Sequence, residues 1–349
     1  MKTPHPDPPP QGGRESIGEY AGRRVLITGG TGFLGLNLGA ALREAGAEVR
    51  TLSRSNPPSG PHPALPQRGR GNDSAWREGD SHFRGDLRDR ALVEQAIEGS
   101  SVVFNLAGHS GSVSSNTEPF EDLDVNLRGQ LTLLEACRRL ADPPAIVFAS
   151  SRLVYRPTTH MPVPESWLTG PLSLYGVHKL AGEHYHLLYE HLYGLRTVVL
   201  RITNPYGHFQ RPTENRYGII NWFIHLALTD QVLPIYGEGE QLRDYVHVDD
   251  VVRAFLMAGA NVGAAGMIFN VGSGTGVSFR QMAEMVVAQA GGGRIERRPW
   301  PADAARVETG DFVADVNRIA GTLGWRPTIA LAGGLGGVIG QYRQMEKIR

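Results

Sequence analysis

The sequence predicts an α/β protein with an open, doubly wound parallel sheet, followed by a smaller α/β domain. The first observation is that short apolar runs of strand length alternate with amphipathic runs of helical period from residue 23 onward. The second is that the first apolar run, residues 23–28, ends in glycines with the spacing G-x-x-G-x-x-G. The third is the length of 349 residues, which fits about two domains. We expect seven parallel strands with right-handed crossovers and helices on both faces.

The composition favours small molecules as partners. Basic and acidic residues balance at 35 each, so no global field attracts nucleic acid or an anionic membrane. No apolar run approaches the about 20 residues of a membrane span, and the single cysteine, Cys137, lies in an apolar helical pattern typical of a core. We therefore expect a cytoplasmic protein that binds neither nucleic acid nor membrane, and we assign no metal ligands. Residues 1–22 have no hydrophobic pattern and are predicted to be a disordered tail.

The first strand, turn and helix predict a nucleotide site. Gly29, Gly32 and Gly35 let a diphosphate approach the backbone. The helix predicted over residues 34–43 begins with free N–H groups and a positive dipole end. A glycine-rich turn without a ligand is the plain alternative, but the strand before and the helix after are both present, as the dinucleotide motif requires. The sequence therefore predicts a Rossmann domain that binds NAD or NADP.

The second strand, residues 48–52, ends without the acidic residue that binds the adenosine ribose hydroxyls in dinucleotide folds. Ser53 and Arg54 stand there instead. An arginine at this place can accommodate a 2′-phosphate, stack on adenine or lie solvated at a loop edge, so Arg54 leaves both NAD and NADP open. Residues 55–80, rich in Pro, Gly and Arg, carry no motif and are predicted to be a solvated surface insertion.

The next two strands predict further cofactor contacts. Asp86 follows a short strand and precedes a helix over residues 91–98, so it can hydrogen-bond the adenine amino group or cap the loop. The buried strand 101–106 ends in Ala107 and other small residues, across which a cofactor can lie flat at the carboxyl edge of the sheet. His109 follows closely, which makes it the histidine best placed for the pocket.

The catalytic hypothesis depends on the end of the strand 145–149 and on the helix that follows it. The strand leads into Ser150 and Ser151. Tyr175 and Lys179 are four residues apart, so they share one face of a helix. A lysine ammonium near a phenol favours the phenolate and lowers its pKa from about 10, which would make the tyrosine a base. Such spacing alone often means a packing tyrosine and a solvated lysine, but its place after a nucleotide turn favours catalysis.

Together these motifs resemble the extended short-chain dehydrogenase/reductases, in particular the nucleotide-sugar epimerases and dehydratases. The likeness runs from about residue 23 to about residue 330. It is carried by the segments 28–35, 85–87, 105–107, 150–155, 175–179, 201–207, 235–250 and 269–274. The resemblance implies an NAD(P)-binding Rossmann domain over residues 23–204, to which 241–264 return, and a mainly substrate-binding domain over 205–349. It also implies a homodimer.

The resemblance implies roles for single residues. Ser151 would polarise the sugar oxygen, Tyr175 would take or give the proton, and Lys179 would hold the nicotinamide ribose while tuning Tyr175. The expected cofactor contacts are Gly29, Gly32, Phe33, Leu34, Gly35, Arg54, Asp86, Leu87, Ala107 and Lys179. The expected substrate contacts are His109, Asn204, Arg243 and Arg306, of which the last three would face the diphosphate. A guanidinium suits this role because it forks onto phosphate oxygens.

Structural interpretations stand beside some of these roles. Arg243 could instead pair with the neighbouring Asp244. Asp249 precedes an apolar helix over residues 251–257 and is predicted to be its N-cap. His178 lies on a different helical face from Tyr175, so it is predicted to be exposed or packed and not a proton relay.

Departures from the family narrow the reaction. The 4,6-dehydratases carry an Asp-Glu pair just after the catalytic hydroxyl, where this chain has Arg152 and Leu153. Leucine cannot transfer a proton, so dehydration is disfavoured. We expect NAD-dependent epimerisation at C4 of a nucleoside-diphosphate sugar, with Tyr175 as the base. The alternatives are an NADP-dependent nucleotide-sugar 4-ketoreductase or dehydrogenase and a non-catalytic nucleotide-sensing Rossmann protein.

Overall fold

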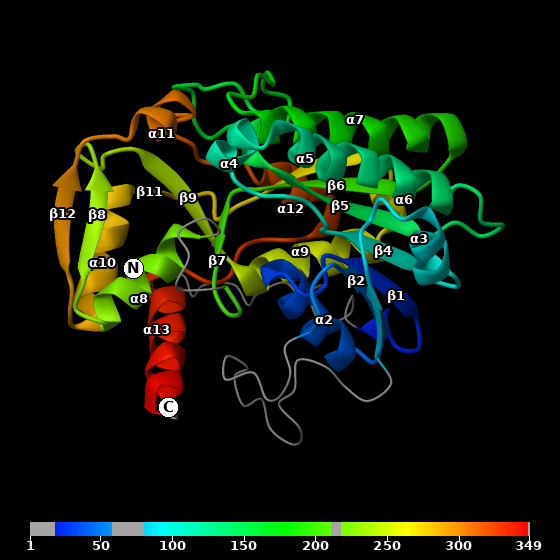
Figure 1. The fold of residues 1–349 in the computed structure, drawn as a ribbon, viewed down its shortest axis with the longest axis horizontal. Helices are drawn as coiled ribbons and strands as arrows, with labels where there is room; N and C mark the ends of the chain where they lie inside the picture. The colour runs from blue at the N-terminus through cyan, green and yellow to red at the C-terminus, as the bar shows by residue number, and fades with distance from the viewer. Residues whose placement is uncertain (1–17, 58–79, 211–217, 348–349) are drawn as a thin grey trace, which may run out of the picture.

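The computed structural model describes residues 18–57, 80–210 and 218–347. Its centre is a parallel sheet of seven strands in the order β10-β6-β5-β4-β1-β2-β3, which confirms the predicted sheet (Figure 1). The strands are β1 (Arg24–Thr28), β2 (Glu48–Ser53), β3 (Ser81–Arg84), β4 (Val102–Asn105), β5 (Ala145–Ser151), β6 (Thr197–Ile202) and β10 (Met267–Val271). Every residue of β4, β5 and β6 is buried, as expected for central parallel strands covered on both faces.

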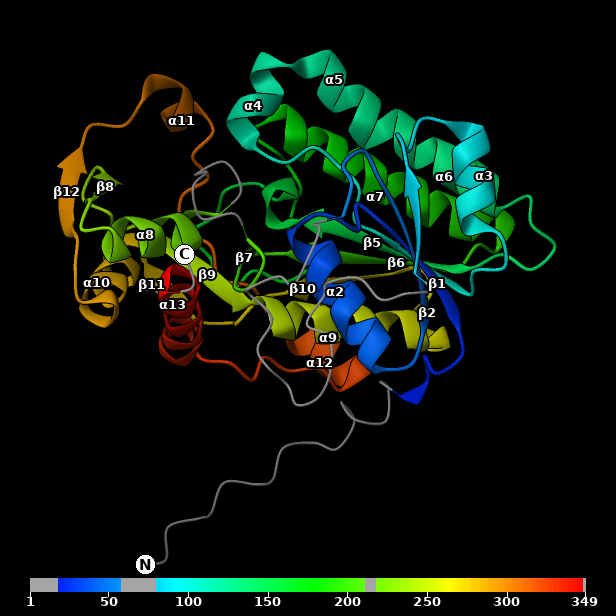
Figure 2. The ribbon, with the colours of Figure 1, turned by 60° about the horizontal axis from the view of Figure 1, so that its bottom comes forward.

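Helices cover both faces of this sheet (Figure 2). On one face lie α2 (Phe33–Glu44), α9 (Val248–Ala260) and α12 (Asn317–Leu323). On the other lie α3 (Arg90–Ile97), α5 (Pro119–Leu123), α6 (Gly129–Cys137) and α7 (Leu174–Tyr193). The strand order reverses between β1 and β4, and ligands of doubly wound sheets bind outside the carboxyl ends of the strands at such a switch point.

A smaller domain packs beside the carboxyl edge of the large sheet (Figure 1). It contains a three-stranded sheet in the order β11-β9-β7 and a two-stranded sheet of β12 and β8. Its strands are β7 (Asn204–Tyr206), β8 (Val232–Tyr236), β9 (Leu242–His247), β11 (Gly276–Ser278) and β12 (Arg294–Arg298). Its helices are α8 (Ile219–Leu228), α10 (Phe279–Ala290), α11 (Ala302–Arg306) and α13 (Leu331–Lys347). This domain has a hydrophobic core of its own.

The domain boundaries differ from the prediction at two places. Residues 18–22 were expected to belong to a disordered tail, but Tyr20 is fully buried and its hydroxyl donates to the Leu256 carbonyl at 2.7 Å. The segments that return to the large domain extend past residue 264, because β10 is an edge strand of the large sheet and α12 packs on its face. Residues 1–17 of the tail and 58–79 of the predicted insertion lie outside the described residues.

The start of α9 corrects a third expectation. The helix begins at Val248, and its N-cap is His247, whose imidazole accepts a hydrogen bond from the Asp249 N–H at 3.2 Å. Asp249 therefore lies in the first turn, where its carboxylate interacts favourably with the positive end of the helix dipole. Across the described ranges, the helices are too short or too polar to span a membrane.

Candidate active site

The glycine turn after β1 forms a cradle that larger residues would fill. Gly29 has a φ of +70°, and a Cβ there would lie 3.1 Å from the backbone of Ala107. A Cβ on Gly35 would lie 2.4 Å from the Gly29 carbonyl oxygen. The N-cap of α2 is Gly32, which provides no side-chain cap for the first N–H groups of the helix. These groups can therefore bind an anion that approaches the turn.

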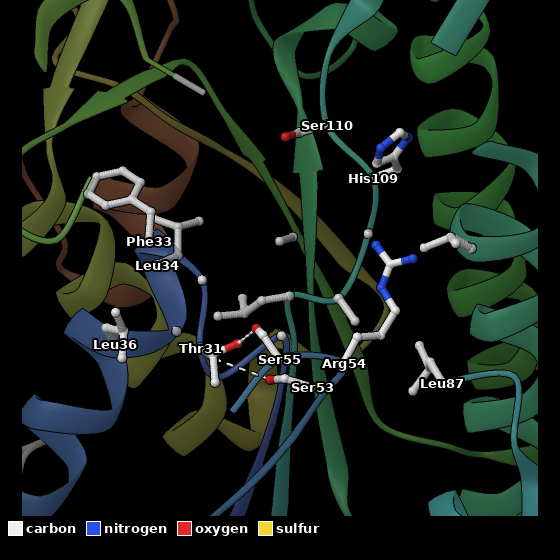
Figure 3. A pocket seen from close by; sticks show the side chains of 18 of the residues that line it. Thr31, Phe33, Leu34, Leu36, Ser53, Arg54, Ser55, Leu87, His109 and Ser110 are labelled. Atoms are coloured by element: carbon white, nitrogen blue, oxygen red, sulfur yellow. Dashed lines mark hydrogen bonds between the residues drawn. The ribbon is translucent and has the colours of Figure 1, made fainter. Parts of the chain in front are cut away.

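The turn forms one wall of a cavity of about 700 Å³ at the carboxyl edge of the large sheet (Figure 3). This size suits a small-molecule ligand. Figure 3 shows Phe33 and Leu34 on one side of the cavity and Leu87 and His109 on the other. Each predicted cofactor contact lines it, namely Gly29, Gly32, Phe33, Leu34, Gly35, Arg54, Asp86, Leu87, Ala107 and Lys179. The cradle and its uncapped helix end fit the diphosphate of NAD.

Hydrogen bonds and an ion pair hold the residues that follow β2 and β3 at the cavity. Ser53 accepts one from the Thr31 N–H at 3.2 Å, so the serine that replaces the expected acid braces the glycine turn. Arg54 forms an exposed ion pair with Glu121 at 3.1 Å. Asp86 accepts hydrogen bonds from the backbone and guanidinium of Arg88, so it does cap its loop. Burial would raise the pKa of Asp86, but these bonds outweigh it and hold the pKa below its usual value.

The three predicted catalytic residues meet at the same cavity. Ser151 is the last residue of β5, Tyr175 is the second residue of α7, and Lys179 follows one turn later. The Lys179 Nζ lies 5.8 Å from the centre of the Tyr175 ring and donates to the Ala149 carbonyl at 2.9 Å. The helix is capped by Ser173, whose hydroxyl accepts from the Gly176 N–H at 3.2 Å. That cap fixes the first turn, which carries Tyr175.

The structure distinguishes the two adjacent serines. Ser150 donates to Glu183, which also forms a buried ion pair with Arg201 at 2.6 Å. The Ser151 hydroxyl accepts from the Leu153 N–H at 3.2 Å and lies close enough to Tyr175 to interact with its phenol. Both serines line the cavity, but the Ser151 hydroxyl is the one that interacts with Tyr175, and its catalytic role stays a prediction.

The pKa values of Tyr175 and Lys179 differ from what the sequence predicts. Burial raises the pKa of Tyr175 to about 12, and a hydrogen bond with Ser151 acts in the opposite direction. Burial lowers the pKa of Lys179 to about 8, against the opposing effect of Asp122. The prediction that the ammonium lowers the phenol pKa is therefore wrong for the protein alone, because burial is the larger effect and the ammonium is bonded to a backbone carbonyl.

A family model decides the class of this chain. The model described as the NAD dependent epimerase/dehydratase family matches residues 25–272. The chain belongs to this family. The protein is therefore an NAD-dependent enzyme of the extended short-chain dehydrogenase/reductase type, as the motifs predicted.

Several proteins are similar to this family member over nearly its full length. A putative UDP-glucose 4-epimerase from Methanocaldococcus jannaschii is 32% identical over 319 residues, which cover 90% of this chain and 97% of the relative. The structure of the epimerase Mth375 from Methanothermobacter thermautotrophicus has a TM-score of 0.86 at 26% identity, with 97% of each chain covered. MoeE5 in complex with UDP-glucuronic acid and NAD has a TM-score of 0.80 at 30% identity, with 92% of this chain and 99% of that chain covered.

Sequence reasoning missed a network beside the predicted catalytic residues of this family member. Asp122 is fully buried and binds the His178 Nδ1 at 2.5 Å, so His178 is packed, as predicted, but with a charged partner. The second oxygen of Asp122 lies 3.6 Å from the Nδ1 of His109, which lines the cavity. Asn126 pairs its amide with the backbone of His109 at 3.0 and 3.1 Å. The sequence offered only one signal for this network, the position of His109 after the fourth strand.

Two of the three predicted diphosphate contacts, Asn204 and Arg243, lie near each other, and their roles toward the diphosphate stay predictions. Asn204 and Arg243 lie on the adjacent strands β7 and β9, and Asn204 donates to the Asp244 carbonyl at 2.9 Å. Arg243 is buried and pairs with Glu308, so the alternative pairing with the Asp244 side chain is wrong. Arg306 is on α11 with an exposed side chain 3.8 Å from Asp303. Its role toward the diphosphate stays a prediction, and this geometry does not support it.

Proposed function

We propose that this protein is a nucleoside-diphosphate-sugar 4-epimerase that oxidises C4 transiently, with Tyr175 as the base. The observation that carries the proposal is the meeting of Ser151, Tyr175 and Lys179 at the end of the cavity whose other end is the glycine cradle. Arg152 and Leu153 stand where the dehydratases carry their acid and base, so the elimination step has no proton donor there. UDP-glucose 4-epimerases among the relatives support the same reaction.

When bound, NAD supplies a hydride acceptor and a positive charge. A positive charge in the cavity favours the phenolate of Tyr175 and so opposes the effect of burial. With NAD accepting the hydride of C4, the phenolate of Tyr175 would take the proton of the C4 hydroxyl. Ser151 donates a hydrogen bond to the C4 oxygen throughout. In the return step, once the other face of the sugar is presented, Tyr175 would give the proton back to the C4 oxygen.

The ketoreductase alternative depended on Arg54 as a contact of the NADP 2′-phosphate. Arg54 already pairs with Glu121, whose carboxylate would repel a 2′-phosphate at the same place. A sensor without catalysis has no need of Ser151, Tyr175 and Lys179 in one cavity. Both features favour the epimerase over the alternatives.

The test is an incubation of the purified enzyme with UDP-glucose and UDP-galactose, read by NMR without added nicotinamide. We expect interconversion at C4 and NAD released on denaturation of the protein. A panel of GDP-, CDP- and dTDP-sugars covers the other bases. Net conversion that requires stoichiometric NADPH, or NAD binding without turnover of any of these sugars, would contradict the proposal.

We also propose a homodimer through the face formed by α5 and α7. This face carries apolar side chains that are exposed in the single chain, among them Phe120, Leu123, Leu188 and Leu192. Exposed apolar side chains on two adjacent helices are typical of an interface. Analytical ultracentrifugation should give a dimer that Phe120→Asp converts to a monomer, whereas a monomeric wild type would refute this arrangement.

A further inference from the structure

Phe209 has a backbone conformation that phenylalanine rarely adopts. Its φ is +63°, in the left-handed region, where the Cβ crowds a backbone carbonyl oxygen. In the described residues, the other non-glycine residue with a positive φ is Asp230, at +51°. Asp230 lies just past the end of α8, and its carboxylate accepts a hydrogen bond from the Gly293 N–H at 2.9 Å. Aspartate is enriched in this conformation, whereas phenylalanine is not, so Phe209 needs another explanation.

Hydrogen bonds on both sides of Phe209 hold the backbone in this conformation. Asn221 of α8 binds both backbone groups of Gly207, the N–H at 3.2 Å and the carbonyl at 2.7 Å. The Tyr342 hydroxyl of α13 donates to the Gln210 carbonyl at 3.0 Å. A strained residue persists where its surroundings fix it in this way, and such residues cluster at ligand sites. The strain therefore indicates a function for the Phe209 side chain.

The chain next to Phe209 lies against the diphosphate cradle. The side-chain nitrogen of Asn37, on α2, donates to the His208 carbonyl at 2.9 Å and to the Phe33 carbonyl at 2.8 Å. Phe33 is the first residue of α2 and directly follows Gly32. One amide thus joins the residue before Phe209 to the start of the helix. Both phenylalanines line the cavity, beside the uncapped N–H groups that fit the diphosphate.

The Phe209 side chain adds an apolar group to this wall of the cavity. Phe209 is 8% exposed and lines the cavity, so little of its ring faces bulk solvent. Hydrogen bonds from N–H groups to a diphosphate are stronger where water is excluded, because the local dielectric constant is low. An apolar ring beside the start of α2 excludes water there.

We propose that Phe209 is a cofactor-retaining residue, whose ring shields the NAD diphosphate from water and slows the release of NAD. The bonds from α8 and α13 keep the ring at the cavity, even though the backbone is strained. The smaller domain thereby contributes to a cofactor site that the large domain otherwise forms. This role concerns the binding of NAD, so it does not depend on which sugar the enzyme converts.

The test is the rate at which bound NAD leaves the purified enzyme. Exchange against excess isotope-labelled NAD, followed by mass spectrometry of the cofactor, measures this rate without turnover. Phe209→Ala should raise the rate about ten- to hundredfold, which corresponds to the loss of one buried phenyl contact. Phe209→Leu keeps an apolar side chain and should raise the rate less. An unchanged release rate in Phe209→Ala would overturn the proposal.

Isothermal titration with UDP separates the cofactor site from the substrate site. The affinity of NAD-loaded Phe209→Ala for UDP should stay within about threefold of the wild-type value. Weaker UDP binding with unchanged NAD release would assign Phe209 to the nucleotide sugar and overturn the proposal. The NAD measurement is valid even if the enzyme epimerises no sugar, so its failure is distinct from failure of the proposed function.

Glycine variants test the strain. Phe209→Gly and Phe209→Ala both lack the ring, but only glycine adopts a positive φ without strain. Phe209→Gly should therefore have the higher urea midpoint, the reverse of the usual order, while both variants release NAD equally fast. Asp230→Gly relaxes the other positive φ, outside the cavity lining, and should leave NAD release unchanged. A higher midpoint for Phe209→Ala, or faster NAD release from Asp230→Gly, would overturn the proposal.

Discussion

Ser150 and Ser151 are neighbours at the end of β5, yet their side chains contact two different regions. In one region the buried charges are paired, and in the other a buried arginine has no bonded carboxylate. The region around Ser150 is closed, because Glu183 and Arg201 are both buried and bind each other and the serine. The region around Ser151 is open, because Tyr175 lines a cavity and Arg152 has no carboxylate partner in the described ranges. The closed region joins β5, β6 and α7, whereas the open one joins the two domains.

The pKa values of Arg201 and Arg152 shift in opposite directions, which reflects the different pairing of the two regions. Burial alone would lower the pKa of Arg201, but its hydrogen bonds with Glu183 outweigh burial and raise it. Burial lowers the pKa of Arg152 to about 9, since no carboxylate bonds to it. Removal of one partner of a buried ion pair destabilises the fold, because the other charge is left uncompensated. A buried charge that no carboxylate bonds can instead be paired by a ligand. Substitutions in the closed region should therefore change stability, and those in the open region should change activity or binding.

The largest expected effect is that of Tyr175→Phe in the open region. Loss of the phenol oxygen removes the group that takes the C4 proton, so kcat for epimerisation should fall by about 10²- to 10⁴-fold. NAD content should stay unchanged, and the urea midpoint should fall only slightly, because the lost hydrogen bond between Tyr175 and Ser151 is worth about 1 kcal/mol. Turnover is read by NMR and the cofactor by absorbance after denaturation. A variant that keeps more than about a tenth of wild-type kcat would remove Tyr175 from the role of base.

The matching substitution in the closed region is Glu183→Gln. It leaves Arg201 buried without a counter-charge, so the free energy of unfolding should fall by about 3 kcal/mol, the lower end of the range because glutamine still accepts hydrogen bonds. Urea titration followed by circular dichroism measures this loss. At temperatures where the variant is folded, kcat should stay close to that of the wild type.

An exposed ion pair provides the control for Glu183→Gln. Glu94 pairs with Arg90 at 2.7 Å on α3, and both side chains are largely exposed. Glu94→Gln makes the same chemical change and should cost at most about 0.5 kcal/mol. An equal loss of unfolding free energy in Glu183→Gln and Glu94→Gln would mean that burial of the ion pair does not increase the cost of breaking it.

Local patterns account for what the sequence predicted. The strands, the glycine turn and the helix face shared by Tyr175 and Lys179 depend on spacings of a few residues, and the structure has them all. The choice of Ser151 over Ser150 came from the family resemblance and not from a local spacing.

Long-range pairing and burial account for what the sequence did not predict. The bond of Arg152 to Thr309 joins residues 157 positions apart, and the pair of Asp122 with His178 joins residues 56 apart. No local period encodes such contacts. The pKa of Tyr175 was mispredicted because the spacing to Lys179 was visible in the sequence, whereas the burial that raises the pKa to about 12 was not. Tyr20 was assigned to a tail for the same reason, since a single aromatic in a polar stretch gives no pattern.

The smallest and sharpest contrast comes from changing each serine to alanine in turn. Ser150→Ala removes one donor from the buried Glu183 and should lower the free energy of unfolding by about 1–2 kcal/mol, with little change in kcat. Ser151→Ala removes the hydroxyl beside Tyr175 and should lower kcat by about ten- to hundredfold with little change in stability. The two variants differ by one position and have the same composition, so each serves as the control for the other in urea titration and NMR turnover. Should Ser150→Ala lose activity while Ser151→Ala loses stability, the two regions would have to exchange their roles.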